Sequence, residues 1–165
     1  PVNLKTPEKV KRHDVLSADE MKLKVEELIE DCDIFIAAAA VSDFKPKEIY
    51  KNKIKKNETE KHLNLKMDKN SDILKVISEK NLNLKTVGFA AETENLLSNA
   101  KKKLSQKKLD LIVANDVSNK DIGFDSDENE VTLITKKEQK KIKKASKKIV
   151  SKKIVEFIAS RVVND

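Results

Sequence analysis

The chain contains a single cysteine, Cys32, among its 165 residues. One thiol can form neither an internal disulfide nor a cysteine-based metal cluster, so the sequence predicts a reducing, cytoplasmic environment and shows no metal-ligand pattern. No apolar run reaches the length that a bilayer requires, and we expect no membrane-spanning segment. The chain begins with Pro1 and has no signal-peptide pattern, which indicates an excised piece of a longer cytoplasmic chain.

Aromatic residues and arginines are scarce as well. Aromatics make up 4% of the chain, and Arg12 and Arg161 are its only arginines, so the net charge of +7 comes from lysine. Proteins that read base edges favour arginine, and proteins that bind single strands stack bases on aromatic rings. Lysines interleaved with glutamates are typical of solvated helix faces. We therefore expect no nucleic-acid partner, while small polyanions stay open as ligands.

Glycine occurs only at Gly88 and Gly123. These two positions are far apart in the sequence, and neither belongs to a G-x-G-x-x-G arrangement. The chain therefore lacks the glycine-rich loop that cradles phosphates in many nucleotide-binding domains.

Apolar periodicity predicts alternating helices and strands. Ser17 and Glu20 have the capping-box spacing ahead of apolar positions that repeat on one helix face. Residues 33–41 instead form a short apolar run, as in a strand that is covered on both faces. The predicted helices are 17–31, a helix that Ser71 begins, 94–107 and 147–163; the predicted strands are 33–41, 63–67, 85–90, 109–114, 129–135 and 140–145, with 42–62 as a loop or flap.

Helices that alternate with short buried strands indicate an α/β fold, here one domain over residues 1–165. We expect a Rossmann-like parallel sheet with helices on both faces and a small antiparallel strand addition. Ligands bind such sheets beyond the carboxyl ends of the strands. Polar pairs follow three of the predicted strands: Ser42 with Asp43, Glu92 with Thr93, and Asn115 with Asp116. The sequence therefore predicts a ligand crevice at this edge of the sheet.

Four motifs, in this order along the chain, resemble those of a known family. They are AAAAVSDFKP at 37–46, KIKK at 53–56, VGFAAET at 87–93, and ANDVS followed by GFDSDENEVTLI between 114 and 134. Together they resemble the bacterial phosphopantothenate-cysteine ligase domain, commonly the C-terminal half of a bifunctional protein whose other half is a decarboxylase. The resemblance covers essentially the whole chain, which corresponds to the C-terminal two-thirds of such a domain.

The resemblance implies a CTP-dependent ligase of coenzyme A synthesis. In such an enzyme the phosphopantothenate carboxylate attacks CTP, pyrophosphate leaves, and the acyl-cytidylate reacts with the amine of cysteine to give the amide and CMP. The implied ligands are CTP with Mg²⁺, phosphopantothenate and cysteine, and FMN belongs only to a separate decarboxylase domain that is not present here. The implied assembly is a homodimer or higher homo-oligomer, for which the strand pair at 129–145 is a candidate edge.

Family positions map residue by residue onto this sequence. Lys53 matches a lysine that binds phosphate and assists passage of the acyl-cytidylate to product, and Phe89 matches a position that packs against the base. The implied nucleotide-binding residues are Ala37, Ala38, Ala39, Asp43, Lys53, Ser71, Asp72, Ile73, Leu74, Phe89, Lys103, Lys107 and Asn115. The implied phosphopantothenate-binding residues are Ala39, Ala40 and Asp43, and the implied catalytic residue is Lys53.

Each of these residues also has a structural interpretation that the sequence leaves open. The alternatives are core packing for Ala37, Ala38 and Phe89, an ordinary helix cap for Ser71, a solvated surface for Lys53, Lys103 and Lys107, and turn formation for Asp43 and Asn115. The carboxylate of Asp72 would itself repel phosphate.

In the resembled family a glycine-rich strand and loop and a segment with Asn, Arg and Ser precede the position of Pro1. We expect part of the nucleotide pocket to depend on that segment. Two other classes therefore stay open: a folded but inactive nucleotide-binding or dimerisation fragment, and an unrelated basic binding module.

Overall fold

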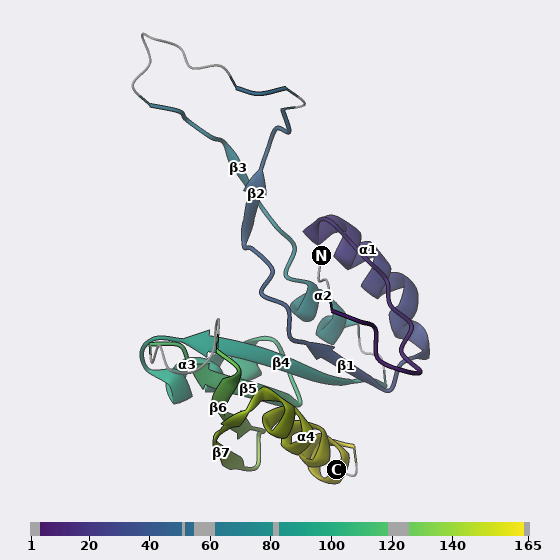
Figure 1. Cartoon of the computed structure of the whole chain (residues 1–165), viewed down its shortest axis with the longest axis vertical. Helices are drawn as coiled ribbons and strands as arrows, with labels where there is room; N and C mark the ends of the chain where they lie inside the picture. Colours follow the sequence, from purple (N-terminus) through teal and green to yellow (C-terminus); the bar gives the residue numbers. More distant parts are fainter. Residues whose placement is uncertain (1–3, 51, 55–61, 81–82, 119–125, 164–165) are drawn as a thin grey trace. The chain divides into compact units, whose positions relative to one another are not determined.

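The computed structural model of the chain describes residues 4–50, 52–54, 62–80, 83–118 and 126–163 (Figure 1). It divides into two compact units. We call Pro1–Glu27 with Ala40–Asp72 the arm unit, and Leu28–Ala39 with Ile73–Asp165 the sheet unit. Each is described by itself, and the expectation of one domain over the whole chain stays a prediction.

The sheet unit contains a five-stranded sheet in the order β1-β4-β5-β6-β7. Its strands are β1 Ile34–Ala37, β4 Lys85–Glu92, β5 Leu111–Asp116, β6 Glu128–Ile134 and β7 Gln139–Ser146. The first three lie parallel to one another, whereas β6 and β7 add on in antiparallel fashion. The α/β fold with parallel strands and a small antiparallel addition is therefore confirmed.

Helices cover both faces of this sheet. Strand β5 is buried from Leu111 to Ala114 because neighbouring side chains point to opposite faces and each face has its own apolar cluster. On one face Leu111 and Val113 pack with α4 (Lys147–Phe157) and the π-helical turn Ile158–Val162. On the other face Ile112 and Ala114 pack with α3 (Leu96–Gln106), and Leu74 of α2 (Ile73–Glu79) joins them.

The arm unit holds α1 and a two-stranded antiparallel sheet. Helix α1 (Ala18–Leu28) begins as the capping-box spacing predicts, because the Glu20 amide donates to Ser17 Oγ at 3.2 Å and the Glu20 carboxylate accepts from the Leu16 amide at 2.8 Å. A short 3₁₀ helix, Ile29–Asp31, continues it into the sheet unit. The two-stranded sheet pairs β2 (Phe44–Pro46) with β3 (Met67–Lys69).

The arm corrects one sequence-based expectation. We expected 42–62 to be a loop and the strand to lie at 63–67, where apolar residues alternate; instead β2 forms within the loop and pairs with β3 at 67–69. Pro46 is tolerated because a two-stranded sheet has only edge strands, in which a missing N–H need not break a ladder. Alternation at Leu63 and Leu65 failed as a strand signal because those side chains are exposed and cover no core.

Strand β1 corrects a second expectation. The run 33–41 was expected to be a strand buried on both faces, but the strand covers only Ile34–Ala37 and Ile36 is 43% exposed. Within the described sheet β1 is an edge strand that pairs with β4 alone, and an edge strand is less enclosed than a central one. Residues Ala38, Ala39 and Ala40 therefore lie beyond the strand and are exposed.

Candidate functional site

The carboxyl edge of the parallel strands holds several of the predicted nucleotide residues. Ala37, the last residue of β1, pairs with Gly88, whereas β4 continues four residues further, to Glu92. Phe89 therefore begins the part of β4 that extends past the end of β1. Its side chain is 37% exposed although its neighbour Ala90 is buried. Phe89 is thus only partly covered by the chain, and its role as a nucleotide contact stays a prediction.

Gly88 brings β4 and α2 into close contact. A Cβ atom at this position would lie 2.7 Å from Leu74 Cδ2 and 2.9 Å from Leu109 Cδ1, so these two side-chain ends would have to shift to admit one. Ile73 is buried and Leu74 partly buried, so both serve the core with their side chains. Of the predicted nucleotide-binding turn at 71–74, only Ser71 and Asp72 expose their side chains, and both belong to the arm unit.

A polar cluster forms where β4 ends. The Glu92 carboxylate accepts from Lys103 Nζ at 2.6 Å and from Asn99 Nδ2 at 3.1 Å. The side chain of Glu92 is only 14% exposed, so the ion pair holds the Lys103 ammonium against the edge of the sheet. Lys107 follows one turn later as the C-cap of α3, and its backbone N–H donates to the Lys103 carbonyl at 3.0 Å.

Sequence reasoning treated Glu92 only as a polar residue that follows a strand, and it missed the contact with Lys103. The signal that could have found this pair was a carboxylate at a strand end, eleven positions before a helical lysine, in a fold that packs that helix on that strand. Such a signal becomes usable only once the packing of α3 is known.

Asn115 and Asp116 end the neighbouring strand β5 and differ in role. Asp116 Oδ1 accepts from the Ser118 hydroxyl at 2.6 Å and from the Ser118 amide at 2.9 Å. These hydrogen bonds lower the pKa of Asp116, with the Ser118 hydroxyl as the largest cause. Asp116 thus forms the turn that was the alternative role for Asn115. The half-buried amide of Asn115 makes no side-chain hydrogen bond to the part of the chain that the structure describes.

Ser42 and Asp43 are held by their backbone in the arm unit. The Asn70 amide donates to the Asp43 carbonyl at 2.8 Å, and Asn70 Nδ2 donates to the Ser42 carbonyl, also at 2.8 Å. The Ser42 hydroxyl donates to the Phe44 carbonyl at 2.8 Å. The exposed carboxylate of Asp43 has no hydrogen-bond partner among the described residues, so it is available to a ligand.

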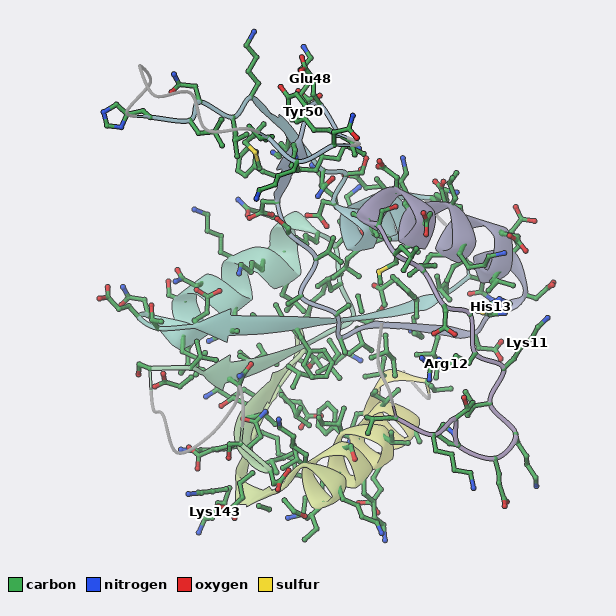
Figure 2. All side chains as sticks on the ribbon, turned by 45° about the horizontal axis from the view of Figure 1, so that its top comes forward. Lys11, Arg12, His13, Glu48, Tyr50 and Lys143 are labelled. Atoms are coloured by element: carbon green, nitrogen blue, oxygen red, sulfur yellow. The ribbon has the colours of Figure 1, made fainter. Side chains whose placement is uncertain are left out.

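Lys53 lies on the wall of a hollow of about 370 Å³ in the arm unit. The other lining residues are Tyr50, Asn52, Ile54, Leu63, Asn64 and Leu65. Lys53 is exposed and makes no ion pair within the described ranges. Figure 2 labels Tyr50 and Glu48 on this arm, where the Tyr50 hydroxyl donates to a Glu48 carboxylate oxygen at 3.1 Å. This hydrogen bond raises the pKa of Tyr50.

The predicted site residues thus fall into two sets. The sheet unit carries Ala37, Ala38, Ala39, Ile73, Leu74, Phe89, Lys103, Lys107 and Asn115, and the arm unit carries Ala40, Asp43, Lys53, Ser71 and Asp72. Within the sheet unit, Ala37, Phe89 and Asn115 share the carboxyl edge of adjacent parallel strands.

Among the residues that the structure describes, no group of three or more His, Cys, Asp or Glu side chains could hold a metal ion. None of the described helices has both the length and the apolarity needed to cross a bilayer.

The sequence matches the family described as the DNA/pantothenate metabolism flavoprotein C-terminal domain over residues 1–162. It is 42% identical over 159 residues to the coenzyme A biosynthesis bifunctional protein CoaBC of Vibrio vulnificus strain CMCP6, covering 96% of this chain. The chain spans about 40% of the length of that relative.

Solved structures show the same similarity. The C-terminal domain of a coenzyme A biosynthesis bifunctional protein CoaBC superimposes with a TM-score of 0.80 at 30% identity, over 100% of this chain and 72% of that one. A Cab2 mutant in complex with phosphopantothenate-cysteine shares the fold, with a TM-score of 0.61 at 19% identity over 84% of this chain and 50% of that one.

Proposed function

Because this chain belongs to the family of the DNA/pantothenate metabolism flavoprotein C-terminal domain, we propose that it carries the ligase step of coenzyme A synthesis. In this step phosphopantothenate is joined to cysteine while CTP is converted to CMP and pyrophosphate.

The observation that carries the proposal is the carboxyl edge of the sheet. Phe89 and Asn115 lie on adjacent parallel strands two positions apart, since Phe89 pairs with Val113 and Ala91 with Asn115. An exposed aromatic ring can stack on a base, and an amide without a partner can both donate to and accept from a ribose or base. Lys103, whose ammonium pairs with Glu92 on the α3 side of the same strand end, is a further cation that we assign to the nucleotide.

The proposed chemistry has two steps. A carboxylate oxygen of phosphopantothenate attacks the α-phosphorus of CTP, the bond to the bridging oxygen breaks, and pyrophosphate leaves with that electron pair. The cysteine amine then attacks the acyl carbon and loses a proton, and CMP leaves with the electron pair of the mixed anhydride. Both steps gather negative charge, so a cation that can approach the phosphates lowers both barriers.

Lys53 is the residue that we assign to this charge. Its ammonium lies on an exposed arm and has no competing carboxylate among the described residues, so it can approach a triphosphate. The exposed carboxylate of Asp43 is suited to accept a hydrogen bond from the amide or hydroxyl of phosphopantothenate. The exposed backbone at Ala39 and Ala40 lets the same substrate approach closely.

Mg²⁺ fits this proposal as a companion of the nucleotide. The described residues offer no cluster of ligands, and Mg²⁺ in nucleotide sites is held largely by substrate phosphates and water. When bound, it would neutralise charge on the triphosphate.

The proposed homodimer does not follow from strand pairing alone. On β7, which has a free edge in the described sheet, Lys141 and Lys144 pair with Glu130 and Glu128, so two copies of that strand would bring Lys140 and Lys143 of each together. Size-exclusion chromatography at low and high salt tests whether β7 forms the dimer interface. Dimerisation through β7 would strengthen with salt, because salt screens the repulsion between lysines. A dimer that does not respond to salt would place the interface elsewhere.

The activity itself is tested by incubating the full-length gene product with CTP, phosphopantothenate and cysteine and measuring release of CMP and pyrophosphate. If neither product is released, the proposal fails.

Replacing CTP with ATP in the same assay determines the nucleotide preference. The 165-residue chain, assayed in parallel, distinguishes a complete ligase from a nucleotide-binding fragment, which would bind CTP without turnover. Salt-sensitive binding of oligonucleotides without CTP binding would instead indicate a basic binding module.

Lys53→Ala provides the sharpest test of a residue role. We expect turnover to fall at least about 100-fold, the scale on which loss of a positioned charge at a transition state is felt, or acyl-cytidylate to accumulate. The matched control is Lys66→Ala, which removes another exposed arm lysine that makes no ion pair among the described residues. Equal kinetics for Lys53→Ala and Lys66→Ala would show that Lys53 is a solvated surface lysine without a catalytic role.

A further inference from the structure

Asn70 is an unusual residue for the base of an exposed arm. It follows the last residue of β3 and precedes Ser71, and only 8% of it is exposed. The residues of β3 itself, Met67–Lys69, are all exposed. The burial of Asn70 therefore comes from its own contacts and not from burial of the strand that precedes it.

Both nitrogens of Asn70 donate a hydrogen bond. Its backbone N–H donates to the Asp43 carbonyl and its side-chain Nδ2 to the Ser42 carbonyl, each at 2.8 Å. The β2–β3 ladder ends at the pair Phe44 and Lys69, so these two bonds extend the pairing past the last ladder residue. The orientation of the side-chain amide is fixed, because a flipped amide would set two oxygens against each other at Ser42.

The acceptor of Asn70 is not in use. Asn70 Oδ1 is buried and has no hydrogen-bond partner among the described residues. A buried acceptor without a partner carries a free-energy penalty, because its bonds to water are lost and not replaced. The unpaired Oδ1 therefore offsets part of the stabilisation that the Nδ2 hydrogen bond contributes.

We propose that Asn70 is a positioning residue of the ligase site. It fixes the carbonyls of Ser42 and Asp43 to the strand that leads into Ser71. The segment with the phosphopantothenate contacts Ala40 and Asp43 thereby keeps one geometry relative to the turn assigned to the nucleotide phosphates. This inference rests on the proposed function and deepens it. It assigns to Asn70 the alignment of the phosphopantothenate carboxylate with the α-phosphorus of CTP.

The test uses three substitutions in the full-length gene product. Asn70→Ala removes the side-chain donor. Asn70→Asp keeps the shape but has no N–H to offer the Ser42 carbonyl. Asn70→Ser keeps a shorter donor. For the first two we expect kcat/KM for phosphopantothenate to fall about 100-fold, as for a small misplacement of reacting groups, while the KM for CTP stays within about threefold. Asn70→Ser should lose less.

Melting temperatures separate positioning from folding. We expect a shift of no more than about 3 °C for Asn70→Ala, because the lost hydrogen bond is offset by removal of the orphan acceptor. Asn83→Ala, which changes an exposed asparagine of the sheet unit, is the matched control and should leave kinetics and melting temperature unchanged.

The outcomes distinguish the two proposals. A wild-type protein that makes no CMP sinks the ligase assignment. An active wild type together with Asn70→Asp at wild-type kcat/KM overturns the positioning role. A large fall in melting temperature with parallel losses for both substrates would also overturn it, because that pattern belongs to a purely structural residue. If Asn70→Ala fails to fold, Asn70→Asp and Asn70→Ser carry the comparison.

Discussion

Tyr50 is the only tyrosine in the chain, and the chain has no tryptophan, so its ionisation can be followed without interference. Its hydroxyl donates to Glu48 on the arm that also carries Lys53. Ionisation of Tyr50 would remove this hydrogen bond and place two negative charges side by side. The protonated form is therefore favoured, and the pKa of Tyr50 is raised.

We expect titration of the tyrosinate absorbance to give a midpoint above the ordinary value of about 10. Because the folded-state pKa is raised, the stabilisation from this contact is present below the unfolded pKa and is lost as pH rises through the folded pKa. Glu48→Gln should bring the midpoint back toward about 10, and Glu8→Gln, an exposed glutamate elsewhere in the arm unit, should not. A wild-type midpoint at or below that of Glu48→Gln would contradict the contact.

At the scale of elements, the close approach of α2 to β4 depends on Gly88. Leu74 and Leu109 occupy the space that a Cβ would need, and both belong to or pack on the apolar cluster beneath α3. Leu74 lies in the first turn of α2, and Ser71 and Asp72 of the predicted nucleotide-binding turn immediately precede that helix. Gly88 therefore serves the close packing of these two leucines against β4.

We expect Gly88→Ala to lower the free energy of unfolding by about 1–3 kcal/mol, the usual range for overpacking a core. Adding Leu74→Val, which shortens one of the two crowding side chains, should recover part of that loss in urea denaturation. Leu97→Val, which shortens an exposed leucine, serves as the control and should recover none. Full stability of the Gly88→Ala protein would show that the leucines move aside without strain.

At the scale of the whole molecule, both apolar clusters consist of residues of the sheet unit. The outer part of the arm, which is the described residues between Lys47 and Lys66, contributes no residue to either cluster. It does carry Lys53, so the chain separates the part that supplies stability from the part that we assign to charge stabilisation.

This separation predicts the effect of excising the outer arm. Lys47 and Lys66 face each other through a 2.9 Å backbone hydrogen bond, so an Asn-Gly turn can join them in place of the residues between. We expect the free energy of unfolding to change by no more than about 1 kcal/mol, as for changes outside a core, while ligase turnover is lost. Urea denaturation and CMP release measure the two effects. A large loss of stability would show that the outer arm supports the core.

The sequence by itself determined the order of elements in the sheet unit, because buried runs such as 109–114 and amphipathic stretches such as 94–107 carry their period locally. It also determined the family, because the motifs at 37–46 and 87–93 lie in register. It could not determine that β1 is an edge strand or that β2 pairs with β3, because pairing joins residues far apart in the chain.

Side-chain partners were decided by the tertiary structure alone. Sequence reasoning named Lys103 and Asn115 but not Glu92 or Asn70, which gain their roles from contacts across eleven and twenty-eight positions. The partial exposure of Phe89 became visible only once the end of β1 was located four residues before that of β4. Local patterns encode which elements form, whereas exposure, pairing and the orientation of a polar group depend on what the fold packs beside it.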